Sequence, residues 1–288
     1  MSGFSFKVTI AGIPICFSSP QQMEIPLELR PFLTPDASEQ ETYEIVLIHQ
    51  PLQFQHQPVF CSDRLAVYSD EDTVTRVFLP LKAPDGCVPV CCQRKNGQNT
   101  LYLPASDWQR YERKCTLSLL LGPESLFLRH DALLLHSSVV QYRGQALLFS
   151  GSSGVGKTTQ AELWEKYRRA EIINGDRCVI AKRGEQFWGC GSPYSGSSGI
   201  YRQKEAPIRA IILPEKAAEN RIERITAQEA FRCLYRELLG NLWDQKYTER
   251  LLNLLQTLLL QIPVYRLYCR PEEAAIQLTE CTVFADRD

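Results

Sequence analysis

This sequence of 288 residues has no excess of charge of either sign. It contains 32 Lys and Arg residues against 33 Asp and Glu residues, a formal net charge of −1, and no run of five like charges. Nucleic acids and anionic membrane surfaces are bound by clustered cations. The composition therefore argues against nucleic acid and a membrane surface as partners.

Long apolar runs are missing as well. No window reaches 18 uninterrupted apolar residues, and residues 1–10 do not form a basic segment followed by an apolar stretch. A membrane-spanning helix needs about 20 apolar residues, and a secretory signal begins with positive charge. We therefore predict a cytoplasmic protein without a membrane segment.

Cysteines at the spacing of disulfide frameworks or metal sites are also lacking. The 11 cysteines are odd in number and irregularly spaced. A chain of this length needs no cross-links to fold around a core. The only dense group, Cys87, Cys91 and Cys92, has neither the C-x-x-C pair nor the nearby histidines of a zinc site. We expect reduced thiols that pack as small apolar side chains.

What the sequence does contain is enough apolar side chains for a substantial core. Hydrophobic residues make up 44% of the chain and charged residues 23%, as is typical of a globular protein. The length suits one large domain or two of moderate size. The pattern of segments favours two, a mainly β domain over residues 1–120 and an α/β domain over residues 121–288, so that the whole chain is mixed α+β.

The first domain is predicted to consist of short strands separated by turn signals. These strands are expected at residues 6–10, 43–48, 65–68, 74–79, 88–94 and 100–103. Asn96-Gly97 between the last two is a strong hairpin signal, because both residues tolerate positive φ. Residues 108–120 are expected to form a helix that Gly122-Pro123 ends. No residue pattern in this domain indicates catalysis, so its role stays unassigned.

The second domain is predicted to alternate strands with helices. A strand at 133–140, a strand at 146–150, a helix at 158–168 and a strand at 171–174 follow one another. This order predicts a βαβ unit with a parallel sheet, in which strand 171–174 lies beside strand 146–150. Further strands are expected at 178–182, 208–213 and 264–269, and helices at 227–239, 246–260 and 272–278.

A glycine-rich loop joins strand 146–150 to the next helix. Its sequence, Gly-Ser-Ser-Gly-Val-Gly-Lys-Thr, matches the phosphate-loop motif G-x-x-x-x-G-K-[ST] at every fixed position. Backbone amides are expected to surround the phosphates of ATP at Gly151, Ser152, Ser153, Gly154, Val155 and Gly156. Lys157 should reach the β- and γ-phosphates, the Thr158 hydroxyl should bind Mg²⁺, and Thr159 completes the predicted nucleotide site.

Asp176 is expected to face this loop. It lies just after strand 171–174, and ligands of open α/β sheets bind beyond the carboxyl ends of the strands. Its carboxylate could hold Mg²⁺ or accept a proton from an attacking hydroxyl. The alternative is an ordinary turn aspartate after Gly175, since Asp and Gly both favour turns.

His136 offers a third element. If strands 133–140 and 146–150 form a hairpin, counting back from the turn sets His136 across from Ser150 or Gly151, at the mouth of the loop. A histidine in an apolar strand can equally be a hydrogen-bonded core residue.

Two further features could contribute to a phosphate-transfer site. Residues 189–199 are rich in Gly and Ser and are expected to form a long loop that covers a substrate or merely connects two elements. A peptide kinase should leave this loop open beside a groove, whereas a metabolite kinase should close it over a small pocket. Arg202, Lys204 and Arg209 could neutralise phosphate charge or could be solvated surface cations.

Taken in order, these motifs resemble the HPr kinase/phosphorylase and phosphoenolpyruvate carboxykinase superfamily. The resemblance depends on Leu-His-Ser-Ser-Val-Val at 135–140, the whole segment 144–159 and Ile-Asn-Gly-Asp at 173–176. Segments 191–196 and 206–213 are similar to the smaller bacterial kinase-like branch of the family. The resemblance covers roughly residues 125–280 and leaves the first domain out.

The resemblance implies a P-loop kinase domain of this type that uses ATP and Mg²⁺. Asp176 matches the second aspartate of the family's Asp-Asp pair, the one proposed as catalytic base, and His136 matches the family's histidine ahead of the loop. Gly175 replaces the first aspartate, which puts the reverse, phosphorylase reaction in doubt. Members of the wider family form oligomers, so a homo-oligomer is compatible with the resemblance.

The predicted function is an ATP-dependent kinase that transfers the γ-phosphate to a hydroxyl, with serine of a peptide or small protein as the leading acceptor. Some members of the branch phosphorylate the terminal serine of ribosomally made peptides, and the signature by which the family recognises HPr has no counterpart here. The predicted catalytic residues are Asp176, His136 and Lys157, with Thr158 and Asp176 as Mg²⁺ ligands. A slowly hydrolysing ATP-binding regulatory protein and a small-metabolite kinase remain alternatives, and a carboxykinase ranks last.

Overall fold

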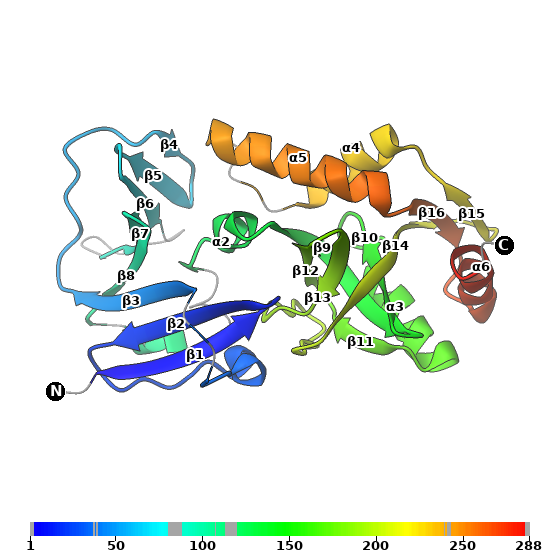
Figure 1. Cartoon of the computed structure of the whole chain (residues 1–288), viewed down its shortest axis with the longest axis horizontal. Helices are drawn as coiled ribbons and strands as arrows, with labels where there is room; N and C mark the ends of the chain where they lie inside the picture. The colour runs from blue at the N-terminus through cyan, green and yellow to red at the C-terminus, as the bar shows by residue number, and fades with distance from the viewer. Residues whose placement is uncertain are drawn as a thin grey trace. The chain divides into compact units, whose positions relative to one another are not determined.

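The computed structural model describes residues 3–36, 38, 40–79, 88–106, 108–112, 120–238, 240 and 243–285 (Figure 1). The chain divides into two compact units, Met1–Pro123 and Glu124–Asp288. Two large sheets account for most of the regular structure in the described residues, and helices are few. The protein is therefore a mixed α/β protein.

The first unit contains an eight-stranded sheet with the order β1-β2-β3-β8-β7-β6-β5-β4. Its strands are β1 (Phe4–Ile10), β2 (Ile13–Ser19), β3 (Glu41–Ile48), β4 (Phe60–Cys61), β5 (Leu65–Ser69), β6 (Thr73–Phe78), β7 (Val90–Lys95) and β8 (Gln98–Pro104). Two short 3-10 helices accompany them, η1 (Leu27–Phe32) and η2 (Trp108–Glu112). The pairs β2–β3 and β3–β8 are parallel, and the neighbouring pairs are antiparallel.

The strand pattern of this unit was legible in the sequence, with two omissions, β2 and the two-residue strand β4. The hairpin at Asn96-Gly97 is confirmed, with φ of 48° and 84° at the two turn residues. A second hairpin of the same kind, at Ala11-Gly12 with φ of 52° and 80°, forms β2, which the sequence analysis missed. Because Ala seldom adopts positive φ, the turn carried no recognisable signal.

Two expectations for this unit fall partly outside the described residues. The helix predicted at 108–120 begins as the 3-10 turn η2, and residues 113–119 are not described. Cys87 is likewise not described, whereas Cys91 and Cys92 are buried in β7. Burial raises the pKa of the Cys91 thiol to about 12, which keeps it protonated. All nine cysteines that the structure describes are free thiols.

The second unit has a sheet in which two long strands serve several neighbours. Its strands are β9 (Ala132–Tyr142), β10 (Gln145–Ser150), β11 (Glu171–Asn174), β12 (Arg177–Arg183), β13 (Gln186–Cys190), β14 (Glu205–Lys216), β15 (Arg221–Arg224) and β16 (Val264–Cys269). The first half of β9 pairs with β12, and its second half pairs with β10 on one side and β11 on the other. Strand β14 pairs in turn with β13, β10 and β16.

The predicted βαβ unit with adjacent parallel strands is wrong. Strands β10 and β11 each pair antiparallel with β9, so they run in the same direction but β9 lies between them. Strand β10 pairs with β9 on one edge, through the hairpin at Arg143-Gly144, and with β14 on the other, so β11 pairs with an edge of β9 instead. The carboxyl ends of β10 and β11 still lie at the same side of the sheet, so the glycine-rich loop after β10 and the turn after β11 meet there.

Side chains on the two faces of the sheet pack into two separate hydrophobic cores. The helices are α2 (Pro123–Arg129), α3 (Lys157–Arg168), α4 (Ala227–Glu237), α5 (Gln245–Gln261) and α6 (Glu273–Val283). Leu147 and Phe149 of β10 pack with α3 and α6, around the fully buried Trp164. Leu148, between them, packs with residues of α4 and α5. Figure 1 shows α5 and α3 on opposite sides of this sheet. A strand buried on both faces explains the continuous apolar sequence of β10.

Two helices of this unit, α4 and α5, begin at side-chain caps. Thr226 accepts a hydrogen bond from the Glu229 backbone N–H at the start of α4, and Asp244 does the same for Tyr247 at the start of α5. Buried Ala230 and Leu234 fix which face of α4 meets the core. Cap and buried face together set the direction of the last residue, Glu237. None of the helices in the described ranges is long and apolar enough to cross a membrane.

Candidate active site

The glycine-rich loop lies between the end of β10 and the start of α3. Gly151, Gly154 and Gly156 have φ of 137°, 83° and 109°, values that side-chain-bearing residues rarely adopt. Gly156 is the N-cap of α3 and offers no side-chain acceptor to the first turn. The first N–H groups of a helix have no partner within it, so this end of α3 has donors and a positive dipole end free for an anion.

Lys157 bends back over this loop. Its side-chain ammonium donates to the carbonyl of Gly151 at 2.7 Å and to that of Ser152 at 3.1 Å. Burial lowers the pKa of Lys157, and the carboxylates of Glu237 and Asp176 oppose that shift. The ammonium is therefore held at the loop and lies in the field of two carboxylates. Thr158 is half-buried in the first turn of α3, and Thr159 is exposed.

Asp176 occupies the turn between β11 and β12, and a buried asparagine fixes its backbone. The side-chain oxygen of Asn174 accepts from the N–H groups of Asp176 and Arg177, both at 2.8 Å. The side-chain nitrogen of Asn174 donates to the carbonyls of Ser192 and Tyr194. Asn174 is fully buried, so the turn has little freedom to move. Local hydrogen bonds of this kind are typical of Asx turns.

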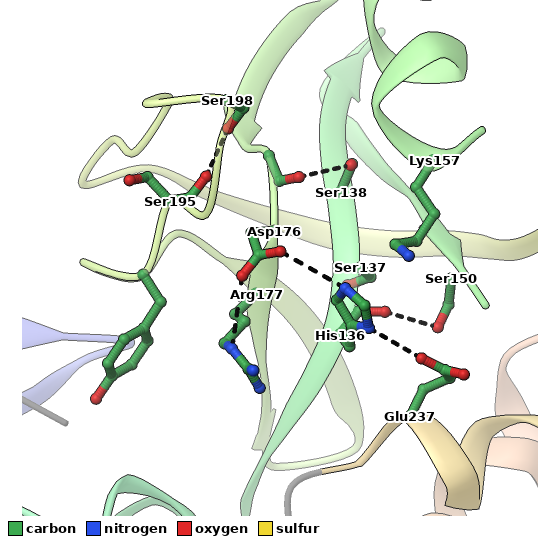
Figure 2. A network of polar contacts seen from close by, with 12 residues as sticks. His136, Ser137, Ser138, Ser150, Lys157, Asp176, Arg177, Ser195, Ser198 and Glu237 are labelled. Atoms are coloured by element: carbon green, nitrogen blue, oxygen red, sulfur yellow. Dashed lines mark hydrogen bonds and ion pairs between the residues drawn. The ribbon is translucent and has the colours of Figure 1, made fainter. Parts of the chain in front are cut away.

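His136 and Asp176 come together at this edge of the sheet (Figure 2). Ser137 pairs with Ser150 in the β9–β10 ladder, which sets His136 one residue further, level with Gly151 as the hairpin count predicted. The ring atom Nε2 of His136 lies 3.5 Å from Oδ1 of Asp176. In Figure 2 the Lys157 side chain points toward the same region. The structure thus gathers the loop lysine, the imidazole and the carboxylate.

The surroundings of Asp176 keep it ionised. The hydrogen bond to His136 lowers the pKa of Asp176 most, and the charges of Arg177 and Lys157 lower it further, while burial opposes them. Nε of Arg177 lies 3.5 Å from Oδ2 of Asp176. A carboxylate with a lowered pKa is a good cation ligand and hydrogen-bond acceptor but a weak proton acceptor.

Glu237 is a residue of this site that the sequence analysis missed. Its Oε2 lies 3.0 Å from Nδ1 of His136, and its side chain is 14% exposed. An isolated bridge between Leu135 and Leu238 ties the end of α4 to β9, directly beside this contact. Glu237 lies 101 residues from His136 along the chain, and no motif links the two. Only tertiary packing brings them together.

The loop at 189–199 is more firmly held than the sequence indicated. Gly189 and Cys190 belong to β13, and Gly191, Ser192, Pro193 and Tyr194 are buried. The tip continues beside Asp176: a Cβ placed on Gly196 would lie 2.6 Å from Cγ of Asp176. A Cβ on Gly175 would lie 2.0 Å from Oγ of Ser198. The packed tip therefore leaves no room for a side chain at position 175.

The three candidate cations make their contacts elsewhere. Arg202 and Lys204 form ion pairs with Glu171 at 2.9 and 2.6 Å, at the start of β11 and so at the end opposite Asp176. Arg209 donates to the carbonyl of Val283 at 2.8 Å, near the end of α6. These contacts give the cations a structural role, and they do not support the suggestion that the three neutralise phosphate charge.

A metal site complete in itself is not present in the described residues, where no group of three or more His, Cys, Asp and Glu side chains could hold an ion. Magnesium is commonly held by one or two carboxylates together with substrate phosphates. The ionised Asp176 and the half-buried Thr158 are oxygen donors of that kind. The donor set suits a cation that arrives with a nucleotide.

Comparisons with known proteins add a distant likeness. No family model matches the chain, and no curated protein matches it. Among the solved structures that match is the Hpr(Ser) kinase/phosphatase from Coxiella burnetii, with 11% sequence identity and a TM-score of 0.29. The match covers 52% of this chain and 93% of that one. Since the likeness is distant in both sequence and geometry, the functional assignment depends on this chain's own residues.

Proposed function

We propose that this protein is an ATP-dependent phosphotransferase that moves the γ-phosphoryl group to a hydroxyl. One observation carries the proposal: the glycine-rich loop, Lys157 and the ionised Asp176 lie together at one edge of the sheet. Asp176 is also in contact with His136 there. Phosphoryl transfer asks a protein mainly for positioning and for neutralisation of charge. A phosphate-binding loop and an acceptor-side carboxylate meet those two needs.

The loop side of the site would hold the nucleotide. Backbone N–H groups of residues 151–156 and the first turn of α3 would bind the phosphate oxygens, and the Lys157 ammonium would exchange its bonds to loop carbonyls for bonds to phosphate. Thr158 and Asp176 would hold Mg²⁺. The bound ion would supply further charge neutralisation between the β- and γ-phosphates.

The opposite side would receive the acceptor. Asp176 and His136 lie where a hydroxyl could approach the phosphate bound on the loop, beside the tip at residues 195–199. Gly196, Ser197 and Gly199 of this tip are exposed. An exposed tip favours an extended acceptor over an enclosed metabolite. We therefore propose a serine hydroxyl of a peptide or small protein as acceptor.

The test is transfer of label from γ-labelled ATP into an extract of the source organism, comparing the native protein with Asp176→Asn. A labelled peptide or protein that depends on Asp176 supports the proposal and delivers the substrate. Label in a small molecule would keep the kinase and replace the acceptor class. Release of free phosphate alone would contradict the proposal and favour an ATP-binding regulatory protein that hydrolyses slowly.

A further inference from the structure

The loop tip at residues 195–199 is anchored to the turn between β11 and β12. The side chain of Asn174 donates to the carbonyl of Tyr194, the residue before the tip, at 3.1 Å. The backbone N–H of Gly175 donates to the carbonyl of Ile200, the residue after the tip, at 3.2 Å. Both ends of the tip are therefore fixed by the turn that carries the carboxylate of the candidate site.

The tip also touches that carboxylate directly. A Cβ placed on Gly196 would lie 2.6 Å from Cγ and 2.7 Å from Oδ1 of Asp176, so the backbone of Gly196 packs against the carboxyl group. Gly196 and Gly199 have φ of 54° and 65°, values that glycine adopts without strain. A hydroxyl on a residue next to Gly196 is thus attached to backbone that already lies beside Asp176.

Three serines of the tip carry hydroxyls, and their surroundings differ. The hydroxyl of Ser198 donates to the carbonyl of Ser195 at 2.7 Å and accepts from a backbone N–H at 3.2 Å, so it is engaged in the turn. The Ser195 side chain points away from Asp176 in Figure 2. Ser197, which directly follows Gly196, is exposed, and its hydroxyl has no partner among the described contacts.

The tip lies on the side from which an acceptor would approach. In phosphoryl transfer the attacking oxygen and the leaving oxygen lie roughly in line with the phosphorus. Ser152 and Ser153 are exposed too, but they belong to the loop whose backbone would hold the nucleotide phosphates, on the side of the leaving ADP. A hydroxyl beside Asp176 is on the other side, so Ser197 is better placed for attack than the serines of the glycine-rich loop.

We propose that the protein phosphorylates its own Ser197 within the same chain. This inference rests on the proposed phosphotransferase function. The Ser197 oxygen bonds to the γ-phosphorus while the bond from that phosphorus to the β–γ bridging oxygen breaks, and ADP leaves with the electron pair. The O–H bond of Ser197 breaks and its proton passes to water, since phosphoserine carries a charge of about −1.5 to −2 at pH 7. Attachment of the hydroxyl beside the site replaces an encounter between two molecules.

The first experiment incubates the purified native protein with ATP and Mg²⁺ and follows its intact mass. We expect the mass to rise by a single phosphate, which fragmentation of the tip peptide should locate at Ser197. Ser197→Ala should lose the phosphate, and Ser197→Thr, which restores a hydroxyl, should carry it on the threonine. The matched control is Ser195→Ala, the same change two residues away, which should be phosphorylated like the native protein.

Two outcomes of this experiment would overturn the inference, namely a native protein that stays unphosphorylated and phosphate at a residue other than Ser197. Calorimetric titration of ATP checks that Ser197→Ala is folded, because the nucleotide is expected on the glycine-rich loop and should bind as in the native protein. Phosphate on Asp176→Asn incubated alone would identify a different enzyme as its source and would also contradict the inference.

The second experiment shows which chain donates the phosphate. Lys157→Ala differs in mass from the native protein, so the two can be followed in one mixture. For transfer within a chain, only the native protein should gain phosphate, and its rate constant should not change on dilution. Phosphate on the Lys157→Ala chains would show transfer between molecules and would contradict the proposed route.

Failure of this inference can be told apart from failure of the proposed function. If the native protein labels a peptide or protein of the extract through Asp176 while Ser197 stays unmodified, the phosphotransferase stands and the self-acceptor is wrong. If the native protein neither binds ATP nor transfers phosphate to any acceptor, the proposed function is wrong and phosphorylation of Ser197 is excluded with it.

Discussion

Buried polar side chains form one self-contained cluster in the first unit and an open one in the second. In the first, Glu41 of β3 accepts from Asn99 at 2.9 Å and from Arg94 at 3.1 Å, and Arg94 also donates to Asn99. These groups satisfy one another inside the sheet. In the second, the Asn174 side chain bonds to backbone groups. Asp176 and Lys157 are charged and lie beside the glycine-rich loop, in which Ser152, Ser153 and Gly154 are exposed. A closed cluster indicates stability, and an open one at strand ends indicates a site.

Of the changes that distinguish the roles of the two clusters, Asp176→Asn should have the largest effect. We expect phosphate transfer to fall by about 10³-fold, because the amide carries no negative charge with which to hold Mg²⁺, while ATP still binds. Single-turnover transfer and calorimetric titration of ATP measure the two quantities. Transfer that persists undiminished would show that the second cluster, like the first, is structural.

The cluster in the first unit should respond in stability and not in activity. Glu41→Ala removes one acceptor from each of Asn99 and Arg94 and should lower the free energy of unfolding by about 2 kcal/mol. Urea denaturation measures the loss. Glu44→Ala, at an exposed position of the same strand, is the control and should change stability by about 0.5 kcal/mol or less. A loss of transfer in Glu41→Ala without a loss of stability would contradict the distinction.

A pair of glycines in the loop tip tests how closely the second cluster is packed. Gly196 and Gly199 have φ of 54° and 65°, so alanine is strained at both, but only at Gly196 does the new methyl group meet Asp176. Gly196→Ala should displace that carboxylate and lower transfer about tenfold. Gly199→Ala, whose methyl group meets nothing within 4 Å, should keep nearly native transfer. Equal losses in both variants would implicate backbone strain alone.

The smallest expected effect is on the pH dependence of stability. Because the folded structure lowers the pKa of Asp176, ionisation of this group favours folding at neutral pH. That contribution should begin to fade near the ordinary aspartate value of 3.8 and be lost as pH falls through the lower pKa of the folded state. Thermal unfolding of native protein and Asp176→Asn over pH 2–6 should therefore converge at the acid end. Parallel curves would show that the charge contributes nothing to folding.

The sequence allowed the local part of this site to be predicted. The motif at residues 151–158 contains its own turn glycines and lies directly between strand β10 and helix α3, so its conformation depends mainly on neighbours in the chain. His136 could be placed from the register of one tight hairpin, since the turn at Arg143-Gly144 fixes every later pair. Asp176 was expected at the correct edge although the neighbour of β11 was wrong, because strand direction alone decides at which edge a strand ends.

The features that could not be predicted depend on contacts distant in sequence. Strand β11 joins β9 and not β10 because β9 and β14 occupy the two edges of β10, a competition that no local pattern records. Glu237 reaches His136 only through the packing of α4 on the sheet. The clash that favours glycine at position 175 arises from Ser198 in another loop. Periodicity identifies elements, and it contains no information on which edge or loop each one will meet.

The most direct test of the account is a calorimetric titration of ATP with Mg²⁺ into the native protein and into Lys157→Ala. Lys157 holds the loop carbonyls and is the cation expected to bind phosphate in their place. We predict saturable binding at one site in the native protein and its loss in the variant, with the fold of both unchanged by circular dichroism. Binding of equal strength in both proteins, or no binding by the native protein, would contradict the assignment of a nucleotide site to this loop.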